Sequence, residues 1–125
     1  MAYSDVDLLA RLIQCEAGGE GDNGMKAVAS VVMNRVEVTY GEYSRLGGIR
    51  DVIYQPGQFT CLQEVVNGAY NRQNIYNMRP DQLHYDIALW AMAGNRLTNL
   101  GQALWFFNPY SPNCRPISQR RWGIL

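Results

Sequence analysis

The sequence predicts a mainly helical α+β domain with one small β element. Apolar residues recur at helical spacing in three stretches, near residues 5–18, 23–38 and 81–94. The helical period is absent from residues 41–57, where glycines and short β-prone runs replace it, and it ends again at Gly94. The 125 residues suffice for one hydrophobic core, so we expect a single domain over residues 1–125.

The first expected helix has a clear beginning and a clear end. Ser4, with Asp7 three residues later, has the pattern of a capping box, and acidic residues there suit the positive end of a helix. Gly18 and Gly19 are expected to end the helix. The apolar residues that recur between these limits are Leu8, Leu9, Leu12 and Ile13.

The second and third helices show comparable signals. The second is expected to begin with Asp22 or Asn23 as its N-cap and to lie buried, because its apolar face is broad. The third is expected to open at residues 79–81, with Pro80 near the first helical position, and to close at Gly94. The buried stripe predicted for this third helix comprises Leu83, Ile87, Trp90 and Ala91.

The small β element is expected from segments near 52–61 and 103–107. The first surrounds a Gln-Pro-Gly turn and predicts either a strand pair or an extended loop. The second is an apolar run that leads into an Asn-Pro turn. Residues 62–79 are ambiguous, because their apolar positions allow a short helix while four asparagines make the stretch turn-rich.

The composition excludes several classes of protein. Hydrophobic residues make up 47% and charged residues 18%, which is typical of a globular chain rather than a disordered one. The formal net charge is zero, so no overall field favours nucleic acid or an anionic membrane, and neither is expected as a partner. No apolar run approaches the roughly 20 residues of a membrane helix, and no secretory signal is visible.

The cysteines and the histidine offer weak candidates for chemistry. The odd number and wide spacing of Cys15, Cys61 and Cys114 argue against a disulfide framework and against zinc, so each is expected to be a partly buried thiol. We expect no metal and no cofactor. Cys15 beside Glu16 suggests a cysteine hydrolase, but that chemistry needs a nearby histidine. His84, which is the only one, shares a helix face with apolar residues, and a structural role is favoured.

Glu16 is the strongest candidate for a catalytic group. It follows Leu12 by four residues and Ile13 by three, so a helix would place its carboxylate on the side of the core leucines. Desolvation there would raise its pKa and keep a proton available near neutral pH. Periodicity alone favours the alternative, in which the chain turns at Gly18 and Glu16 reaches water.

Longer motifs favour the catalytic interpretation. Residues 16–20 read Glu-Ala-Gly-Gly-Glu, and residues 27–36 form an apolar run that ends in Asn-Arg-Val. Residues 52–60 read Val-Ile-Tyr-Gln-Pro-Gly-Gln-Phe-Thr, and residues 103–109 read Ala-Leu-Trp-Phe-Phe-Asn-Pro. In this order, the motifs resemble the SleB/CwlJ cell wall hydrolase family over residues 8–109. Ordered motifs over nearly the whole chain are far more specific than any single short pattern.

The resemblance implies a fold and a set of site residues. The family's enzymes cleave peptidoglycan, best known in the spore cortex at germination, and the implied fold is a lysozyme-like or lytic-transglycosylase-like core. The implied catalytic residue is Glu16. The residues implied to bind substrate are Glu20 lining the cleft, Gln58, Phe59 and Thr60 on the opposite wall, and Phe107 and Asn108 on the floor.

The sequence departs from the family pattern in two places. Gly18 stands where the family often has arginine, which removes one possible substrate contact. The family's Gly-x-His-x-Phe-like ending is absent, and the chain ends in Trp-Gly-Ile-Leu. The last strand of the domain is therefore expected to be truncated or divergent.

The activity implied by the resemblance is that of a lytic transglycosylase with one catalytic acid. Glu16 would act alone in cleaving the bond between N-acetylmuramic acid and N-acetylglucosamine. A one-acid mechanism is favoured because the glycines after Glu16 separate Glu20 from the same helix face. The alternatives are a muramidase that pairs Glu16 with Glu20 or Asp22, an N-acetylmuramoyl-L-alanine amidase, and a non-catalytic wall-binding module. We expect a monomer that acts on glycan strands at the coat–cortex boundary of a spore, with accessory spore proteins as further possible partners.

Overall fold

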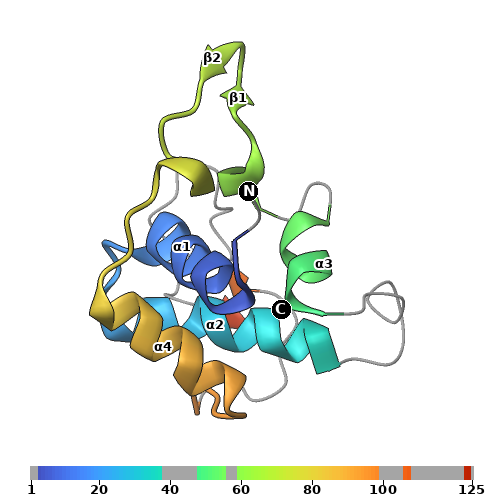
Figure 1. Ribbon diagram of the computed structural model, residues 1–125, viewed down its shortest axis with the longest axis vertical. Helices are drawn as coiled ribbons and strands as arrows, with labels where there is room; N and C mark the ends of the chain where they lie inside the picture. Colours follow the sequence, from blue (N-terminus) through green and yellow to red (C-terminus); the bar gives the residue numbers. More distant parts are fainter. Residues whose placement is uncertain (1–2, 38–47, 56–58, 99–105, 108–122, 125) are drawn as a thin grey trace.

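Three helices form the body of the molecule. The computed structural model describes residues 3–37, 48–55, 59–98, 106–107 and 123–124, the last two ranges by their backbone alone. Helices α1 (Asp5–Ala17), α2 (Gly21–Glu37) and α4 (Gln82–Met92) pack against one another (Figure 1). The expectation of three helices near 5–18, 23–38 and 81–94 is confirmed for the described residues, and residue 38 lies outside them.

Helix α1 is the central helix of this group. It begins where the sequence predicts, since the backbone N–H of Asp7 donates to Oγ of Ser4 at 3.2 Å. Apolar residues lie on most of its circumference, which suits a helix that other elements surround. Its buried residues are Leu8, Leu9, Ala10, Leu12, Ile13, Cys15 and Ala17.

Helix α4 differs in detail from its prediction. Its N-cap is Asp81, so Pro80 precedes the helix rather than occupying its first position. Leu83 is 46% exposed, and its predicted burial is wrong, because the buried face runs one residue later in the helix. The residues buried on that face are His84, Ile87, Ala88 and Ala91, with Trp90 packed partly against the core.

The strand pair expected around residues 52–61 is wrong. Residues Ile49–Tyr54 form a helix, α3, and Thr60–Leu62 form a 3₁₀ turn, η2. Ile49, Val52 and Ile53 recur at helical spacing and are buried where α3 packs against α1 and α2. Burial against neighbouring helices therefore overrides the β propensity of these β-branched residues.

Residues 65–70 form a β-hairpin instead of the short helix that the ambiguous stretch allows. Strand β1 (Val65–Val66) pairs antiparallel with β2 (Ala69–Tyr70). Asn67 and Gly68 both have positive φ, 54° and 80°, as a two-residue type I′ turn requires. The hairpin projects from the helical body at the top of Figure 1, and the 3₁₀ turn η3 (Ile75–Asn77) follows it.

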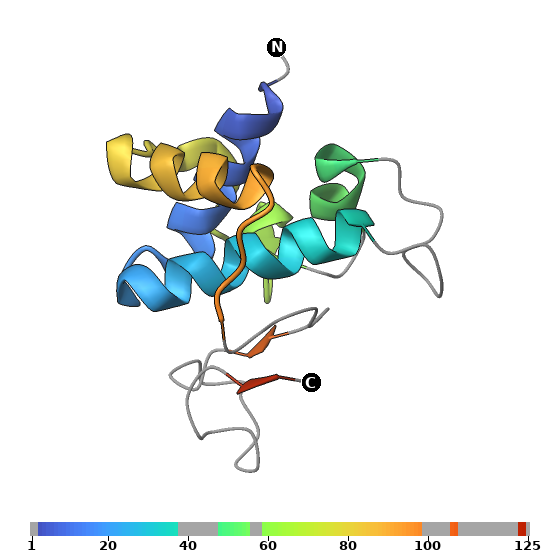
Figure 2. The same cartoon turned by 90° about the horizontal axis from the view of Figure 1, so that it is seen from below.

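A second small sheet lies on the other side of the molecule. Strand β3 (Phe106–Phe107) pairs antiparallel with β4 (Gly123–Ile124), with Phe106 opposite Ile124. Figure 2 shows this sheet on the side of α2 that faces away from α1 and α4. The strand expected near 103–107 is confirmed at its last two residues, but its partner is the end of the chain and not residues 52–61. Residues 103–105 lie outside the described part.

A polar network fixes α1 against the segment that leads into α4. The guanidinium of Arg11 donates to the carbonyl oxygens of Met78 at 2.8 Å and Ile75 at 3.3 Å. Nε of Arg11 and the hydroxyl of Tyr85 both donate to Oδ1 of Asp7, at 3.3 Å and 2.8 Å.

Within the described ranges, no helix is long and apolar enough to cross a membrane.

The enclosure of α1 predicts a large loss of stability for Leu12→Ala. The Leu12 side chain is 0% exposed, so its truncation removes buried methyl groups and leaves a cavity, and we expect a loss of about 2–5 kcal/mol in the free energy of unfolding. Leu89→Ala is the matched control, because Leu89 is 52% exposed, and it should change stability by less than about 0.5 kcal/mol. Urea unfolding followed by circular dichroism measures both. Equal losses would contradict the central position of α1.

Candidate active site

Glu16 lies in the last turn of α1, where the helix emerges from the core. Leu12 and Ile13, which share its side of the helix, are both 0% exposed. Burial raises the pKa of Glu16 from 4.5 to about 7. The negative end of the helix dipole acts in the same direction, because it disfavours a carboxylate in the last turn. The carboxyl group therefore keeps its proton to a higher pH than an exposed glutamate, as a general acid should.

Glu20 is separated from Glu16 by a tight turn. The backbone N–H of Glu20 donates to the carbonyl oxygen of Ala17 at 3.0 Å, and Gly21 follows with a φ of 79°. Gly18 closes the helix, since its N–H donates to the Gln14 carbonyl oxygen at 2.9 Å. A Cβ at Gly18 would lie 2.5 Å from that oxygen, so a larger side chain there would force this turn to shift. The two glutamates do not share one continuous helix face.

Phe59 and Thr60 lie at the start of η2 with different exposure. The Phe59 ring is only 5% exposed and belongs to the hydrophobic core, where the Arg35 guanidinium lies 5.3 Å from its centroid. Thr60 is exposed. In this arrangement Phe59 anchors the segment in the core, and Thr60 presents its side chain to solvent.

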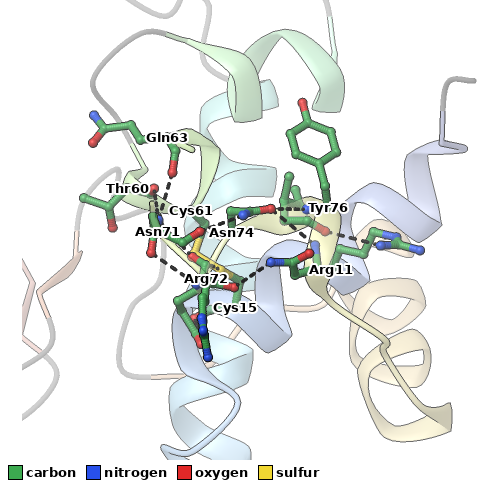
Figure 3. Close-up of a disulfide and its surroundings, with 12 residues drawn as sticks. Arg11, Cys15, Thr60, Cys61, Gln63, Asn71, Arg72, Asn74 and Tyr76 are labelled. Carbon is green, nitrogen blue, oxygen red and sulfur yellow. Dashed lines mark hydrogen bonds between the residues drawn. A yellow bond between two sulfur atoms is a disulfide. The ribbon is translucent and has the colours of Figure 1, made fainter. Parts of the chain in front are cut away.

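A disulfide joins these two parts of the molecule. Cys15, next to Glu16, is bonded to Cys61, next to Thr60, and their Cα atoms are 6.2 Å apart (Figure 3). The Cα atom of Glu16 lies about 3.8 Å from that of Cys15, and the Cα atom of Thr60 lies about 3.8 Å from that of Cys61. The Cα atoms of Glu16 and Thr60 are therefore at most about 14 Å apart.

The expectation of free thiols is therefore wrong for Cys15 and Cys61. An odd count leaves room for one pair and one remaining cysteine, and sequence spacing does not identify the pair. The pairing became possible because α1 and η2, which are far apart in the chain, pack against each other. Cys114 lies outside the described residues.

We call the contact between the last turn of α1 and the η2 segment the junction. Side-chain amides also hold it together, and the sequence did not reveal them. Nε2 of Gln73 donates to the Cys15 carbonyl oxygen at 3.0 Å. Nδ2 of Asn71 lies within hydrogen-bond distance of two carbonyl oxygens of the η2 segment, Gln63 at 2.8 Å and Thr60 at 3.3 Å (Figure 3). The polar, turn-rich character of residues 62–79 is the one signal in the sequence that pointed to such a role.

The remaining residues predicted to bind substrate are only partly placed. Phe107 belongs to β3 through its backbone, and its side chain is not described. Gln58 and Asn108 lie outside the described residues. The grouping of Phe59, Thr60 and Asn108 opposite Glu16 therefore stays a prediction.

His84 has a structural role in the cap of α4. Its Nδ1 accepts a hydrogen bond from the Asp81 backbone N–H at 3.0 Å, while the Asp81 side chain caps the same helix. The ring is buried at 6% exposure, as its helix face predicts. Since Cys15 is bonded to Cys61, it offers no thiol for a cysteine hydrolase. The described residues contain no group of three or more side chains suited to hold a metal ion.

Comparison with known proteins agrees with this architecture. A sequence model of the family described as Cell Wall Hydrolase matches residues 19–123, beginning just after Glu16. The cell wall hydrolase CwlJ of Bacillus subtilis (strain 168) is 35% identical over 106 residues, which are 85% of this chain and 68% of that protein. CwlJ of Halalkalibacterium halodurans is 32% identical over 86% of this chain and 70% of its own length.

Two solved structures have the same fold. The catalytic domain of the germination-specific lytic transglycosylase SleB from Bacillus anthracis superposes with a TM-score of 0.65 and 29% identity, over 93% of this chain and 84% of that one. The SleB catalytic domain of Bacillus cereus gives the same TM-score, with 30% identity over 93% of this chain and 80% of that one. The expectation of a mainly helical, lysozyme-like α+β fold is confirmed. With this fold, and with a family match over most of its length, the chain belongs to the SleB/CwlJ family of cell wall hydrolases.

Proposed function

We propose that this protein is a peptidoglycan-lytic enzyme that cleaves the bond between N-acetylmuramic acid and N-acetylglucosamine. Glu16 is its single catalytic acid, and the reaction is that of a lytic transglycosylase. The observation that carries the proposal is the partly buried Glu16 carboxyl group, with its pKa raised to about 7, in the last turn of the central helix. The similarity to the B. anthracis lytic transglycosylase SleB supports the same reaction.

One carboxyl group can perform both proton transfers of this reaction. Protonated Glu16 donates its proton to the glycosidic oxygen as the bond to C1 of the muramyl residue breaks. The resulting carboxylate removes the proton from the muramyl 6-hydroxyl, whose oxygen then bonds to C1. The product is a 1,6-anhydro sugar, and Glu16 is protonated again for the next cycle. A pKa near 7 suits both roles, because the group is acid and base in turn.

The turn after α1 favours this reaction over a two-carboxylate one. Glycosidases that use water normally need two carboxyl groups on either side of the scissile bond. Glu20, the nearest acidic residue along the chain, is on the turn that ends α1 and takes part in another interaction of its own. We propose that Glu20 lines the cleft rather than sharing the proton transfers.

The proposed substrate contacts come from segments that the fold brings towards Glu16. Thr60 is exposed beside the disulfide and offers a hydroxyl to the sugar or its N-acetyl group. We assign the same wall to Gln58, with the buried ring of Phe59 supporting it from the core side, and Phe107 and Asn108 as the floor. The substrate we propose is spore cortex peptidoglycan, on the strength of the germination-specific relative.

The proposed role of Glu16 predicts that Glu16→Gln abolishes glycan cleavage. The amide cannot supply the proton, and we expect turnover to fall by roughly 10²–10⁴-fold. Mass spectrometry of fragments released from spore cortex and from vegetative sacculi measures the loss and identifies the product. Wild type should release 1,6-anhydro-muramyl ends.

Two further variants separate the alternatives. Glu20→Gln should retain most of the activity, because one acid suffices, whereas a muramidase that needs Glu20 would lose it and would release reducing ends. Glu64→Gln, at an exposed position before β1, is the matched control and should act as wild type. Release of free peptide stems would indicate an amidase. More than half of the wild-type activity in Glu16→Gln would refute the assignment.

The buried carboxyl group also predicts a pH-dependent stability. The folded state holds the Glu16 proton up to about pH 7 and the unfolded chain only to about 4.5, so folding is less favourable as pH rises through this range. Glu16→Gln removes this effect. The variant should be more stable than wild type at pH 8 by up to about 3 kcal/mol, with the advantage shrinking to nothing near pH 4. Urea unfolding across pH 4–8 tests this, and parallel stability curves would show that Glu16 is not buried.

A further inference from the structure

The Cys15–Cys61 disulfide occupies a particular place relative to the proposed site. It joins the residue before Glu16 to the residue after Thr60, over a sequence separation of 46. Both cysteines are buried, with exposures of 6% and 2%. The bond therefore spans the gap between the last turn of α1, which carries the proposed acid, and the segment proposed as the facing wall.

We propose that this disulfide is a positioning element of the active site, and that its reduction lowers turnover while the helical core stays folded. The inference rests on the proposed function of Glu16. The proposal gives Cys15 and Cys61 no contact with substrate. They act by fixing where Glu16 lies relative to the Thr60 segment.

Few other contacts hold these two segments together. Among the described polar contacts, those that reach the last turn of α1 from the 59–74 segment join Gln73 to Cys15: Nε2 of Gln73 donates to the Cys15 carbonyl oxygen at 3.0 Å, and Sγ of Cys15 lies 3.1 Å from the Gln73 carbonyl oxygen. Asn71 holds the 60–63 turn to its own side of the junction, since its amide contacts the Thr60 and Gln63 carbonyls. Without the disulfide, the contacts of Gln73 and the local packing would determine the position of Thr60 relative to Glu16.

Cys15 and Cys61 lie at the edge where α1 meets η2, and most of the helical packing involves other residues. Helices α1, α2 and α4 pack through residues several turns from the disulfide, such as Leu8, Val28 and Ile87. Arg11 and Asp7 connect α1 to η3 and α4 independently of the cysteines. Opening the disulfide should therefore change the junction and leave the body of the molecule in place.

The reduction is a balanced two-electron exchange. Dithiothreitol breaks the S–S bond, is itself oxidised to its cyclic disulfide, and its two thiol protons leave one proton on each of Cys15 and Cys61. Removal of the reductant followed by mild oxidation reverses the step. A catalytic group displaced by about 1 Å can lose on the order of 10²-fold in rate, so a small movement of the junction is enough to be measured.

The experiment uses the full chain as wild type and as four variants: C15S, C61S, C15S/C61S and C114S. Thiol counting in denaturant comes first, and unreduced wild type should show one free thiol. Initial rates on soluble glycan strands then give kcat and KM between pH 5 and 9, and thermal unfolding gives the folded fraction. Dithiothreitol-treated wild type is assayed before and after reoxidation, so the test does not depend on the folding of any variant.

In dithiothreitol-treated wild type we expect kcat to fall at least about tenfold, with KM nearly unchanged. In C15S, C61S and the double variant kcat should fall by the same factor, because each of them lacks the same bond. C114S should match wild type and keep its sensitivity to reduction. Reoxidation should restore activity to wild type.

The pH profile separates positioning from loss of folded protein. Activity of the wild type should fall as pH rises through about 7, because the acid must be protonated. Burial causes the raised pKa of Glu16. A loosened junction admits water, so the alkaline limb should move to lower pH. Because stability itself falls as pH rises, the folded fraction is measured at each pH and the rate is divided by it; loss of folded molecules alone would then leave the corrected pH profile unchanged.

Several results would overturn the inference. Three free thiols in unreduced protein would show that the bond does not form. Full activity in folded C15S/C61S, with Glu16→Gln inactive, would overturn the positioning role and leave the proposed function standing. A rate that falls only in proportion to the folded fraction, while the alkaline limb of the pH profile stays in place, would also overturn the positioning role and leave the proposed function standing. Full activity in Glu16→Gln would overturn the proposed function and this inference together.

Discussion

The enclosure of α1 by its neighbours is the constraint on which the rest of the structure depends. Residues on most of its circumference are buried, and α2, α3, α4, η2 and η3 all contact it. Because the helix is surrounded, its last turn carries Glu16 into a partly desolvated place, and this burial raises its pKa. The packing that stabilises the fold therefore also produces the raised pKa on which the proposed role of Glu16 rests. This buried carboxyl group opposes folding at neutral pH, as groups arranged for catalysis often do.

The site is assembled from segments that are distant in sequence and joined at one end of α1. The helix supplies Glu16, the η2 segment supplies Thr60, and the disulfide with the amides of Asn71 and Gln73 connects them. The hairpin at residues 65–70 lies between the two halves of this junction in the chain, so its tight Asn-Gly turn returns the backbone to α1. A rigid helix and a covalent bond can hold a reacting group more precisely than loops alone.

Local sequence signals were sufficient for the elements that depend on local physics. The Ser4 cap, the apolar period of α1 and the presence of α2 and α4 follow from backbone hydrogen bonding and from one buried face per helix. The expected N-cap of α2 at Asp22 or Asn23 is wrong, because the helix already begins at Gly21. The spacing of Glu16 to Leu12 and Ile13 allowed a raised pKa, but periodicity alone favoured a solvent-exposed Glu16, and only the longer motifs favoured the catalytic interpretation. The structural role of His84 was also predictable, since its helix position faces the core.

Tertiary structure alone decided the features that depend on which segments meet. Residues 49–54 form a helix because α1 and α2 bury Ile49, Val52 and Ile53, although their β-branched side chains favour a strand locally. Leu83 is exposed because a rotation of one residue in α4 moves the buried face to His84. The pairing of Cys15 with Cys61, and of β3 with the end of the chain, required distant segments to be placed next to each other. Sequence by itself determined the three long helices and the candidate acid, because these follow from neighbours along the chain and from ordered motifs. The partners of each element depend on packing between surfaces, whose free energy no local pattern encodes.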